Sequence, residues 1–304
     1  MQINSVFIED TFAEAFTMRA TRMTITGTDE YWAMQAAQAA TGFATSVIGC
    51  GVEAGIEGPS LITPDGRPGL DCLFFATSKD GLEAALIERV GQAVMTASTT
   101  ACFCGSMAET TGTLAEQANV GGKLRFFGDG YQASKIVGDT RYWRIPVMDG
   151  EFLIQEEFAV TKAVGGGNFL ILAENEAAAL GAARAAVEKM RKLRGVILPF
   201  PGGAVRSGSK VGSRYKFLVA STNTAYCPTI KGRIEDSKLP AGVNAVLEIV
   251  IDGLTGDLVG KAMRLGITAA CGAPGVVGIT AGNYEGRLGK HQFHLHKLLG
   301  GDAQ

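Results

Sequence analysis

The sequence predicts an α+β protein built from two ferredoxin-like (split βαβ) lobes that are related by an apparent duplication. Two observations carry this prediction: both halves of the chain show the same order of strands and helices, and one short run recurs. Asp80-Gly81-Leu82, followed by Leu86 and Arg89, matches Asp252-Gly253-Leu254, followed by Leu258 and Lys261, at an offset of 172 residues. A seam near Asp149-Gly150 divides the chain into lobes over residues 1–150 and 151–304.

The first half alternates strand and helix signals. Arg22 to Gly27 is predicted to be a strand, and Thr28 or Asp29 is expected to cap a helix that continues to Ala40. Ser46 to Cys50 and Gly69 to Thr77 are predicted to be strands. A second helix, with Asp80 near its start, is expected to reach about Ala97.

The second half repeats that order. Asn168 to Ala173 is predicted to be a strand, and Asn175 is expected to cap an alanine-rich helix from Glu176 to Leu193. Gly195 ends this helix, and Val196 to Leu198 leads into a glycine-rich loop. The remaining predicted elements are a strand over Ala245 to Ile251, a helix from about Leu254 to Ala270 and a strand over Val276 to Ala281.

Composition limits the function classes. The chain has 304 residues, of which 46% are hydrophobic, 19% are charged and 41 are glycine. This length allows a large core, and the low charge content favours extensive subunit contacts. The formal net charge of −2 argues against a general nucleic-acid-binding protein, which needs a basic face.

Neither a membrane segment nor a secretion signal is expected. The chain has no run of eighteen apolar residues, and Met1 to Phe12 carries acidic residues rather than an apolar core. The six cysteines are scattered without metal-ligand spacing, and Cys102-x-Cys104 is too closely spaced for a redox motif. We therefore expect a cytoplasmic protein with reduced thiols.

The loop from Pro199 to Asn223 is rich in glycine, serine and cationic residues. Such a loop lets the backbone approach a ligand closely and offers positive charge to an anionic one. Gly203-x-x-x-x-Gly208-Ser209-Lys210 nearly matches a phosphate-binding P-loop, but Ser209 intervenes and Tyr215 to Ala220 is predicted to be a strand. A nucleoside-triphosphate site is therefore not expected. Lys210, Arg214 and Lys216 either cradle another anion or are solvated cations of a hairpin.

Glu248 is the strongest candidate for chemistry. It lies in an otherwise apolar strand, and alternation places it on one face with Val246 and Val250. Burial of a carboxyl between two valines raises its pKa, so that it can hold a proton near neutrality and act as a general acid. The alternative is a glutamate on a solvent-facing edge strand, or one paired with a lysine or arginine.

Other candidates rank lower. Glu156 and Glu157 follow a similar apolar run, where two adjacent acids are typical of a solvated edge. His294 and His296 are expected to share a strand face with His291 nearby, but no cysteine or acid completes a metal site, so none is assigned. Because all three histidines fall at the end of the chain, no Ser-His-Asp or Cys-His arrangement is expected, and direct transfer between two bound substrates is the simpler chemistry.

Several sequence blocks together resemble one family. They are Ile3 to Phe16 (INSVFIEDTFAEAF), Phe126 to Tyr131 (FFGDGY), Gly165 to Phe169 (GGGNF), PFPGG from Pro199, SGSKVGS from Ser207 and YKFL from Tyr215. Over residues 1 to about 298 the chain resembles formylmethanofuran:tetrahydromethanopterin formyltransferase. The resemblance implies a proximal and a distal lobe, which we assign to residues 1–150 and 151–304. It also implies formyl transfer between a methanofuran-type carrier and N5 of tetrahydromethanopterin, with both carriers as substrates and no prosthetic group.

The resemblance gives the candidate residues roles. It aligns Glu248 with the proposed catalytic glutamate of the family. The backbone of Gly202 and Gly203, or the hydroxyls of Ser207 and Ser209, would stabilise the oxyanion of a tetrahedral adduct. By residue type and position in the loop alone, Lys210 and Lys216 would hold the anionic tails of the carriers, Phe200 would face a flat ring, and Asn223 would belong to the substrate site.

The resemblance also implies partners. Family members are homo-oligomers, commonly tetramers, with the active site at a subunit interface. A related polypeptide of methylotrophic bacteria works within a formyltransferase/hydrolase complex, so hydrolase-complex subunits are possible partners. Two alternatives stay open: a scaffold subunit that docks a hydrolase without turnover of its own, and a formyl or acyl transferase that uses folate.

Overall fold

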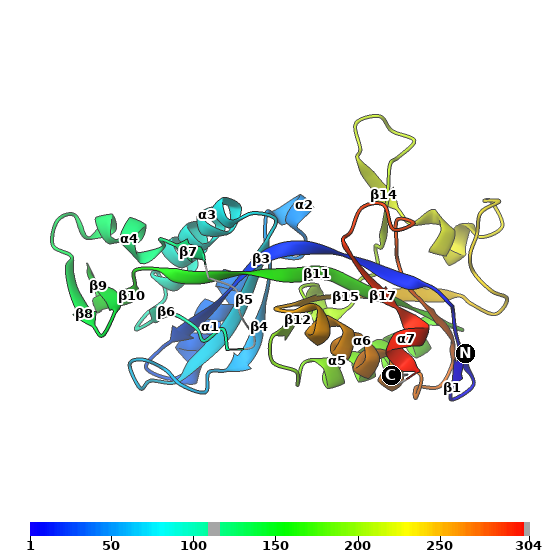
Figure 1. Ribbon diagram of the computed structural model, residues 1–304, viewed down its shortest axis with the longest axis horizontal. Coiled ribbons are helices and arrows are strands. Elements are labelled where there is room, and N and C mark those ends of the chain that lie inside the picture. Colours follow the sequence, from blue (N-terminus) through cyan, green and yellow to red (C-terminus); the bar gives the residue numbers. More distant parts are fainter. Residues whose placement is uncertain (109–115, 301–304) are drawn as a thin grey trace.

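The computed structural model describes residues 1–108 and 116–300, which form two lobes arranged along the long axis of the molecule (Figure 1). The N-terminal lobe contains β3 (Phe12–Thr26), α1 (Glu30–Thr41), α2 (Val47–Cys50), β4 (Glu53–Pro59), β5 (Gly69–Ala76), α3 (Lys79–Arg89), η1 (Val90–Val94), β6 (Ala101–Cys104), β7 (Glu116–Ala118), α4 (Gly121–Leu124), η2 (Arg125–Gly128), β8 (Ala133–Val137), β9 (Thr140–Val147) and β10 (Gly150–Gln155).

The C-terminal lobe takes both chain ends. It contains β1 (Gln2–Ile3), β2 (Val6–Ile8), β11 (Phe158–Ala173), α5 (Glu176–Met190), β12 (Val196–Ile197), η3 (Pro201–Gly203), β13 (Ser209–Val211), β14 (Ala220–Thr222), η4 (Thr224–Tyr226), η5 (Pro228–Ile230), β15 (Ala245–Gly253), α6 (Gly256–Ala270), β16 (Val276–Thr280), β17 (His291–His294) and α7 (Leu295–Leu299).

Both lobes use the same element order and the same sheet order. β3-α1-β4-β5-α3-β6 in the first corresponds to β11-α5-β12-β15-α6-β16 in the second. The strands lie in the orders β6-β3-β5-β4 and β16-β11-β15-β12, and every neighbouring pair is antiparallel. The predicted offset of 172 residues is wrong, because the equivalent helices α3 and α6 begin at Lys79 and Gly256, 177 residues apart. The short sequence match therefore aligns a helix turn with a strand end.

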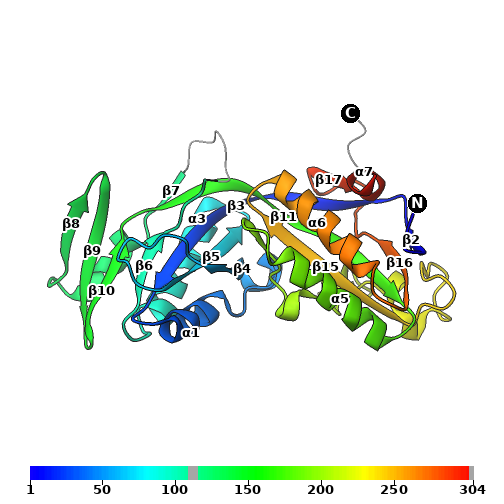
Figure 2. The same cartoon turned by 90° about the horizontal axis from the view of Figure 1, so that it is seen from below.

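Two long strands join the lobes into one mixed sheet. β3 and β11 run across the molecule and pair antiparallel from Thr161 opposite Ala20 to Gly165 opposite Phe16 (Figures 1 and 2). The register of β11 shifts between Val164 and Gly167, where the strand leaves β3 and continues along β15. Helices α5 and α6 cover one face of the C-terminal part of this sheet (Figure 2).

Helix starts follow the predicted caps. The Asp29 carboxylate accepts the Trp32 N–H at 3.1 Å, and the Asn175 side chain accepts the Ala178 N–H at 3.0 Å. These contacts satisfy amide donors that the first turn leaves free. Each lobe then buries its own apolar cluster, one around Phe74, Phe152 and Phe158 and the other around Phe169 and Met263.

Three local predictions are wrong. Residues 46–50 form the short helix α2, because the Ser46 hydroxyl caps it by accepting the Ile48 N–H and Gly51 ends it in a left-handed conformation. Tyr215 to Val219 form the loop of the β13–β14 hairpin, closed by a Leu218 N–H to Tyr215 carbonyl bond, and only Ala220 is in a strand. His296 does not share a strand with His294, since α7 begins at Leu295.

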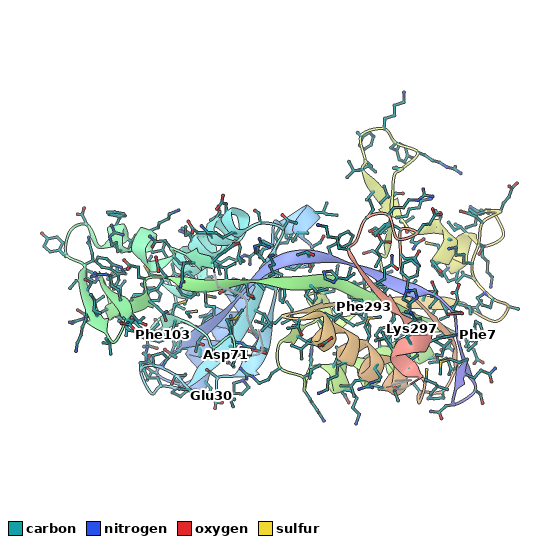
Figure 3. The ribbon with its side chains drawn as sticks, viewed as in Figure 1. Phe7, Glu30, Asp71, Phe103, Phe293 and Lys297 are labelled. Atoms are coloured by element: carbon teal, nitrogen blue, oxygen red, sulfur yellow. The ribbon has the colours of Figure 1, made fainter. Side chains whose placement is uncertain are left out.

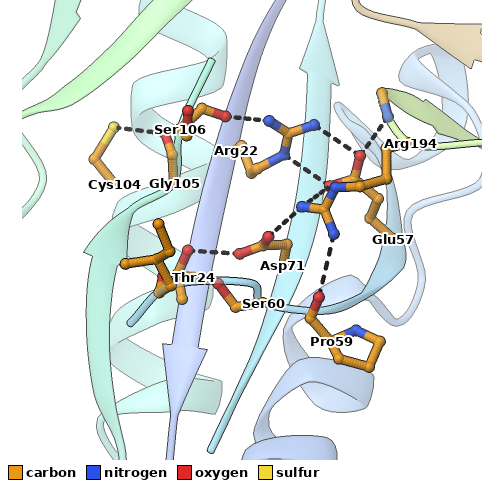
Figure 4. Close-up of polar contacts among 12 residues, drawn as sticks. Arg22, Thr24, Glu57, Pro59, Ser60, Asp71, Cys104, Gly105, Ser106 and Arg194 are labelled. Carbon is orange, nitrogen blue, oxygen red and sulfur yellow. Dashed lines mark hydrogen bonds and ion pairs between the residues drawn. The ribbon is translucent and has the colours of Figure 1, made fainter. Parts of the chain in front are cut away.

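A buried ion network holds the lobes together (Figure 4). Arg22 of β3 makes a bidentate pair with Glu57 of β4, with both N–O distances 2.7 Å and both side chains almost fully buried. Arg194, in the loop that follows α5, binds Asp71 at 2.5 Å and Glu57 at 3.4 Å. The Gly195 N–H also donates to Glu57. Because this network joins β3, β4 and β5 to the start of the Pro199 loop, it fixes that loop relative to the N-terminal lobe.

The cysteines of the described residues are all free, and Cys72, Cys102 and Cys271 are buried. Over the same residues, no helix combines the length and apolar character that a membrane span requires.

Candidate active site

A cavity of about 710 Å³ lies where the two lobes meet, a size typical of small-molecule sites. We call it the central cavity. Ser46, Val47, Ile48, Glu53 and Thr77 of the N-terminal lobe line one end. The other end is lined by the Pro199–Asn223 loop, β15, the second half of β11 from its register shift onward, and the segment from Ala281 to Tyr284.

Glu248 stands in this cavity on an interior strand. β15 pairs with β11 on one side, where Leu170 is opposite Glu248, and bridges to Val205 on the other through backbone hydrogen bonds of 2.7 and 2.9 Å. Val250 lines the cavity beside it, whereas Ile249 and Ile251 point into the core, as the alternation predicts. Within residues 1–108 and 116–300, no side-chain hydrogen bond or ion pair of the Glu248 carboxyl occurs. The solvated-edge and paired-glutamate alternatives are therefore wrong.

This setting changes the protonation of Glu248. Burial beside apolar strand neighbours raises the pKa of Glu248 to about 7. A carboxyl with this pKa is partly protonated near neutrality and can both give and take a proton. The backbone of the glycine-rich loop approaches it closely, since a Cβ on Gly208 would lie 3.0 Å from Glu248 Oε2.

Glu14 lines the same cavity in a contrasting setting. Its carboxylate accepts N–H groups from Tyr284 at 2.7 Å, Gly286 at 2.9 Å and Leu288 at 2.5 Å, and also from Gly289. Burial alone would raise the pKa of Glu14, but these backbone donors outweigh it and the pKa is lowered. Glu14 therefore stays ionised and shapes the loop that carries Tyr284.

Tyr284 lines the cavity near both carboxyl groups. Its ring is 6.3 Å from that of Phe16, and both residues line the cavity. Burial, with the negative charges of Glu248 and Glu14, raises the pKa of the Tyr284 hydroxyl. The hydroxyl is thus kept neutral and can donate a hydrogen bond to a ligand.

The structure brings together most of the predicted site residues. Phe200, Ser207, Ser209, Lys210 and Asn223 all line the central cavity with Glu248. Lys210 is held by a 2.8 Å bond from its ammonium group to the Thr224 hydroxyl. At Ser209 the chain enters strand β13 rather than a helix, so this segment does not have the geometry of a P-loop.

Three predicted residues lie outside the cavity lining. The Gly203 N–H is used inside a turn, where it donates to the Phe200 carbonyl at 2.8 Å, and Gly202 is exposed beside it. Lys216 is exposed in the loop of the β13–β14 hairpin, which stands clear of the body (Figures 1 and 3). These positions give no support within one chain to an oxyanion role for the two glycines or to a ligand contact for Lys216.

The lower-ranked candidates lie elsewhere. Glu156 is in the bend between β10 and β11, where it accepts the Trp143 indole N–H at 3.1 Å and pairs with Arg141 at 3.4 Å. His291 contacts the Thr17 hydroxyl at 3.0 Å, and His296 contacts the Ile8 carbonyl at 2.9 Å. Among the described residues, no group of three or more His, Cys, Asp or Glu side chains is placed to hold a metal ion.

Sequence reasoning missed several cavity residues. Glu14 and Phe16 lie in the INSVFIEDTFAEAF block and Asn168 in the GGGNF block, yet neither block pointed to the cavity. Glu53 and Tyr284 had no local sequence signal, because long-range packing brings them to the site.

Asn168 supports the site by accepting the Gly282 N–H at 2.6 Å and donating to the Gly282 carbonyl at 3.1 Å.

Two family models cover nearly the whole chain. The model described as "Formylmethanofuran-tetrahydromethanopterin formyltransferase" matches residues 1–147, and the model described as "FTR, proximal lobe" matches residues 150–298. That description attaches the word proximal to residues 150–298 and not to residues 1–150. We therefore keep the terms N-terminal and C-terminal lobe.

Similar proteins agree with these models. The formylmethanofuran–tetrahydromethanopterin formyltransferase of Methylococcus capsulatus is 56% identical over 98% of this chain and all of its own length. One subunit of the formyltransferase/hydrolase complex of Methylorubrum extorquens is 51% identical, over 98% of this chain and 97% of its own.

Solved structures share the fold. The formyltransferase of Methanosarcina barkeri matches with a TM-score of 0.90 and 48% identity, over 98% of this chain and all of its own. A chain of the Methylorubrum extorquens formyltransferase/hydrolase complex, solved with methylofuran, matches with a TM-score of 0.93 and 50% identity, over 98% of both chains. With this coverage and identity, the chain belongs to the formylmethanofuran–tetrahydromethanopterin formyltransferase family.

Proposed function

We propose that this chain transfers a formyl group between the amine of a methanofuran-type carrier and N5 of tetrahydromethanopterin. The observation that carries the proposal is Glu248, a carboxyl without a hydrogen-bonding partner in a cavity large enough for two reacting groups, in a chain of this family. Both carriers act as substrates, and the transfer needs no prosthetic group.

The reaction follows from the chemistry of a formamide. N5 attacks the formyl carbon and gives a tetrahedral adduct with negative charge on oxygen. As the adduct collapses, the carbon–nitrogen bond to the furan carrier breaks and the departing nitrogen takes the proton of Glu248. The resulting carboxylate accepts the proton that N5 loses, so no net proton is consumed.

Other cavity residues bind the two carriers and stabilise the oxyanion of the adduct. The hydroxyls of Ser207 and Ser209 are the predicted oxyanion donors that line the cavity, and one such donor typically contributes about 3–4 kcal/mol. Holding both carriers in attack geometry contributes roughly 7–11 kcal/mol at most. Positioning by Phe200, Lys210 and Asn223 is therefore the larger contribution.

The purified chain alone, supplied with both carriers, tests this function. We expect formylated pterin by mass spectrometry, with no signal when either carrier is omitted. No turnover alone, but turnover with hydrolase-complex subunits added, would indicate an obligate complex like the one named for the Methylorubrum relative. No turnover under either condition would support the scaffold alternative. Preference for tetrahydrofolate would support the folate alternative.

We also propose an oligomeric protein, a homotetramer or a subunit of a hydrolase complex, in the cytoplasm. Large apolar side chains stand exposed on two projections, around η2, β8 and β9 and on the β13–β14 hairpin. They are Phe126, Phe127, Tyr131, Ile136, Val137, Tyr215, Phe217 and Val219. Such side chains favour burial against another subunit. Native mass spectrometry checks the proposal, and a strictly monomeric, active chain would contradict it.

The finer fold assignment is likewise a proposal. Each lobe follows the βαββαβ order with antiparallel neighbours, which supports two ferredoxin-like lobes that arose by duplication. Separate expression of residues 1–150 and 151–304 tests the division, although β3 and β11 cross the junction and will leave unpaired strand edges.

A further inference from the structure

A second pair of carboxyl groups lies at the lobe-junction end of the central cavity. Glu53 begins β4 and lines the cavity, and Asp252 stands on β15, on the strand face that carries Glu248 and Val250. Asp252 is 0% exposed and Glu53 is 8% exposed. Their side chains are hydrogen-bonded to each other across the junction of the two lobes.

The hydrogen bonds of the pair define its charge. Asp252 Oδ1 accepts the Gly166 N–H at 2.9 Å, Glu53 Oε1 accepts the Val47 N–H at 3.0 Å, and Asp252 Oδ2 has no partner that donates to it. Burial raises the pKa of both carboxyl groups, and the negative charge of Glu53 and the hydrogen bond to Glu53 raise the pKa of Asp252 further. A proton on Oδ2, donated to Glu53, satisfies both groups and leaves one negative charge on Glu53.

Glu53 then has hydrogen-bonding capacity to spare. An ionised carboxylate has about four lone-pair sites, and the Val47 N–H and the Asp252 proton use two of them. The remaining sites require donors, because an unsatisfied buried charge is costly. Two parallel N–H groups in one plane match this geometry.

The walls of this end favour a flat ring. Phe16, Met18, Val47 and Ile48 line it with apolar atoms. Gly165 and Gly166 let the side chains of Met18 and Phe16 pack directly on the backbone of β11, since a Cβ on Gly165 would clash with Met18 Sδ and one on Gly166 would lie 3.4 Å from the Phe16 ring. A bicyclic heteroaromatic ring can therefore lie between these walls with its polar edge toward Glu53.

We propose that the Glu53 carboxylate accepts hydrogen bonds from the 2-amino group and the N3–H of the pterin ring; this inference rests on the proposed function. Glu248 and Asp252 are separated along β15 by about 13 Å, at roughly 3.3 Å per residue. The fused rings then lie between the two carboxyl groups, with N5 directed toward Glu248. Asp252 is a positioning residue, which keeps the Glu53 carboxylate in place through its proton.

The test compares three variants in binding titrations with tetrahydromethanopterin and with methanofuran. Glu53→Gln replaces one acceptor oxygen with an amide that donates, so we expect a pterin Kd at least tenfold higher and a methanofuran Kd within twofold of the parent. Glu188→Gln makes the same chemical change at an exposed glutamate of α5 outside the cavity lining, and both Kd values stay within twofold. Asp252→Asn keeps a hydrogen-bond donor to Glu53, so we expect it to raise the Kd for tetrahydromethanopterin less than Glu53→Gln does.

A ligand-side experiment keeps the inference testable if Glu53→Gln fails to fold. Pterin and lumazine differ in that the 2-amino group is replaced by an oxo group, and the parent chain should bind pterin at least tenfold more tightly. Equal binding of the two, or a Glu53→Gln variant that weakens both carriers alike or neither, would overturn the inference. In those cases formyl transfer by the parent still stands, whereas absence of tetrahydromethanopterin binding by the parent would refute the proposed function itself.

Discussion

Glu248 and Glu14 line one cavity and have opposite protonation behaviour. Glu14 is 1% exposed, yet backbone N–H groups from four residues keep it ionised and lower its pKa. Glu248 is more exposed but has no such donors, and its pKa rises to about 7. The difference shows that backbone donors to a carboxylate can outweigh the effect of burial, so that one acid stays charged while the other, buried without donors, can supply a proton.

Glu248→Gln is expected to have the largest effect, because it tests directly whether Glu248 supplies the proton. The amide has the same shape but cannot give a proton to the departing nitrogen, so we expect kcat to fall by about a hundredfold or more. Carrier affinities and the unfolding temperature should change little. Steady-state formyl transfer, followed by mass spectrometry, checks this. Turnover unchanged by the substitution would keep the enzyme and reject Glu248 as the acid.

Glu14→Gln tests whether the backbone N–H groups that bind the ionised Glu14 carboxylate stabilise the fold. A glutamine has one acceptor oxygen, and its NH₂ group faces backbone donors, so buried N–H groups lose their partner. We expect a loss of about 3 kcal/mol in the free energy of unfolding, the upper range for an unsatisfied buried donor. Denaturant unfolding measures it, with Glu9→Gln as the control at an exposed glutamate of the same cavity.

The pH dependence of unfolding sharpens the contrast, because the two residues contribute with opposite sign. The lowered pKa of Glu14 gives stability that is present above its ordinary value of 4.5 and is lost as pH falls through its folded pKa. The raised pKa of Glu248 gives stability that is present below 4.5 and is lost as pH rises toward about 7. In a plot of unfolding free energy against pH, Glu14→Gln should remove only the loss of stability at low pH. Glu248→Gln should remove only the loss of stability between 4.5 and about 7. Identical curves for the two variants would contradict the assignment.

Gly208→Ala moves the Glu248 carboxyl without changing its chemistry. The added methyl group would lie 3.0 Å from Glu248 Oε2, so the carboxyl must shift by a few tenths of an ångström. We expect kcat to fall roughly tenfold, since reacting groups tolerate little displacement. Gly232→Ala, which meets no atom within 4 Å, is the matched control. Equal rates for the two variants would show that the approach of the loop is unimportant.

The smallest effect is expected at Lys216. Lys210 lines the cavity and Lys216 does not, so Lys210→Ala should raise the KM of one carrier severalfold and Lys216→Ala by less than twofold. Initial rates at varied carrier concentration measure this. A Lys216→Ala effect as large as that of Lys210→Ala would indicate that the hairpin reaches the cavity of a second copy.

The sequence could predict what depends on local patterns. Alternation placed Glu248 on one strand face with Val246 and Val250, Asp29 and Asn175 capped their helices, and the composition of the glycine-rich loop marked one wall of the cavity. Local patterns failed at residues 46–50, where a serine cap and a terminal glycine make a short helix from a strand-like run. Glu14 and Tyr284 were missed because they are about 270 residues apart and meet only through sheet packing. Glu53 and Asp252 likewise come from different lobes.

The most direct test of the account is the pH profile of kcat for the parent and for Glu248→Gln. The protonated acid is the active form, so the parent should lose activity as pH rises through about 7. The variant, at its much lower rate, should lack this descending limb. A limb of the same position and height in both proteins would contradict the assignment of Glu248 as the group that gives the proton.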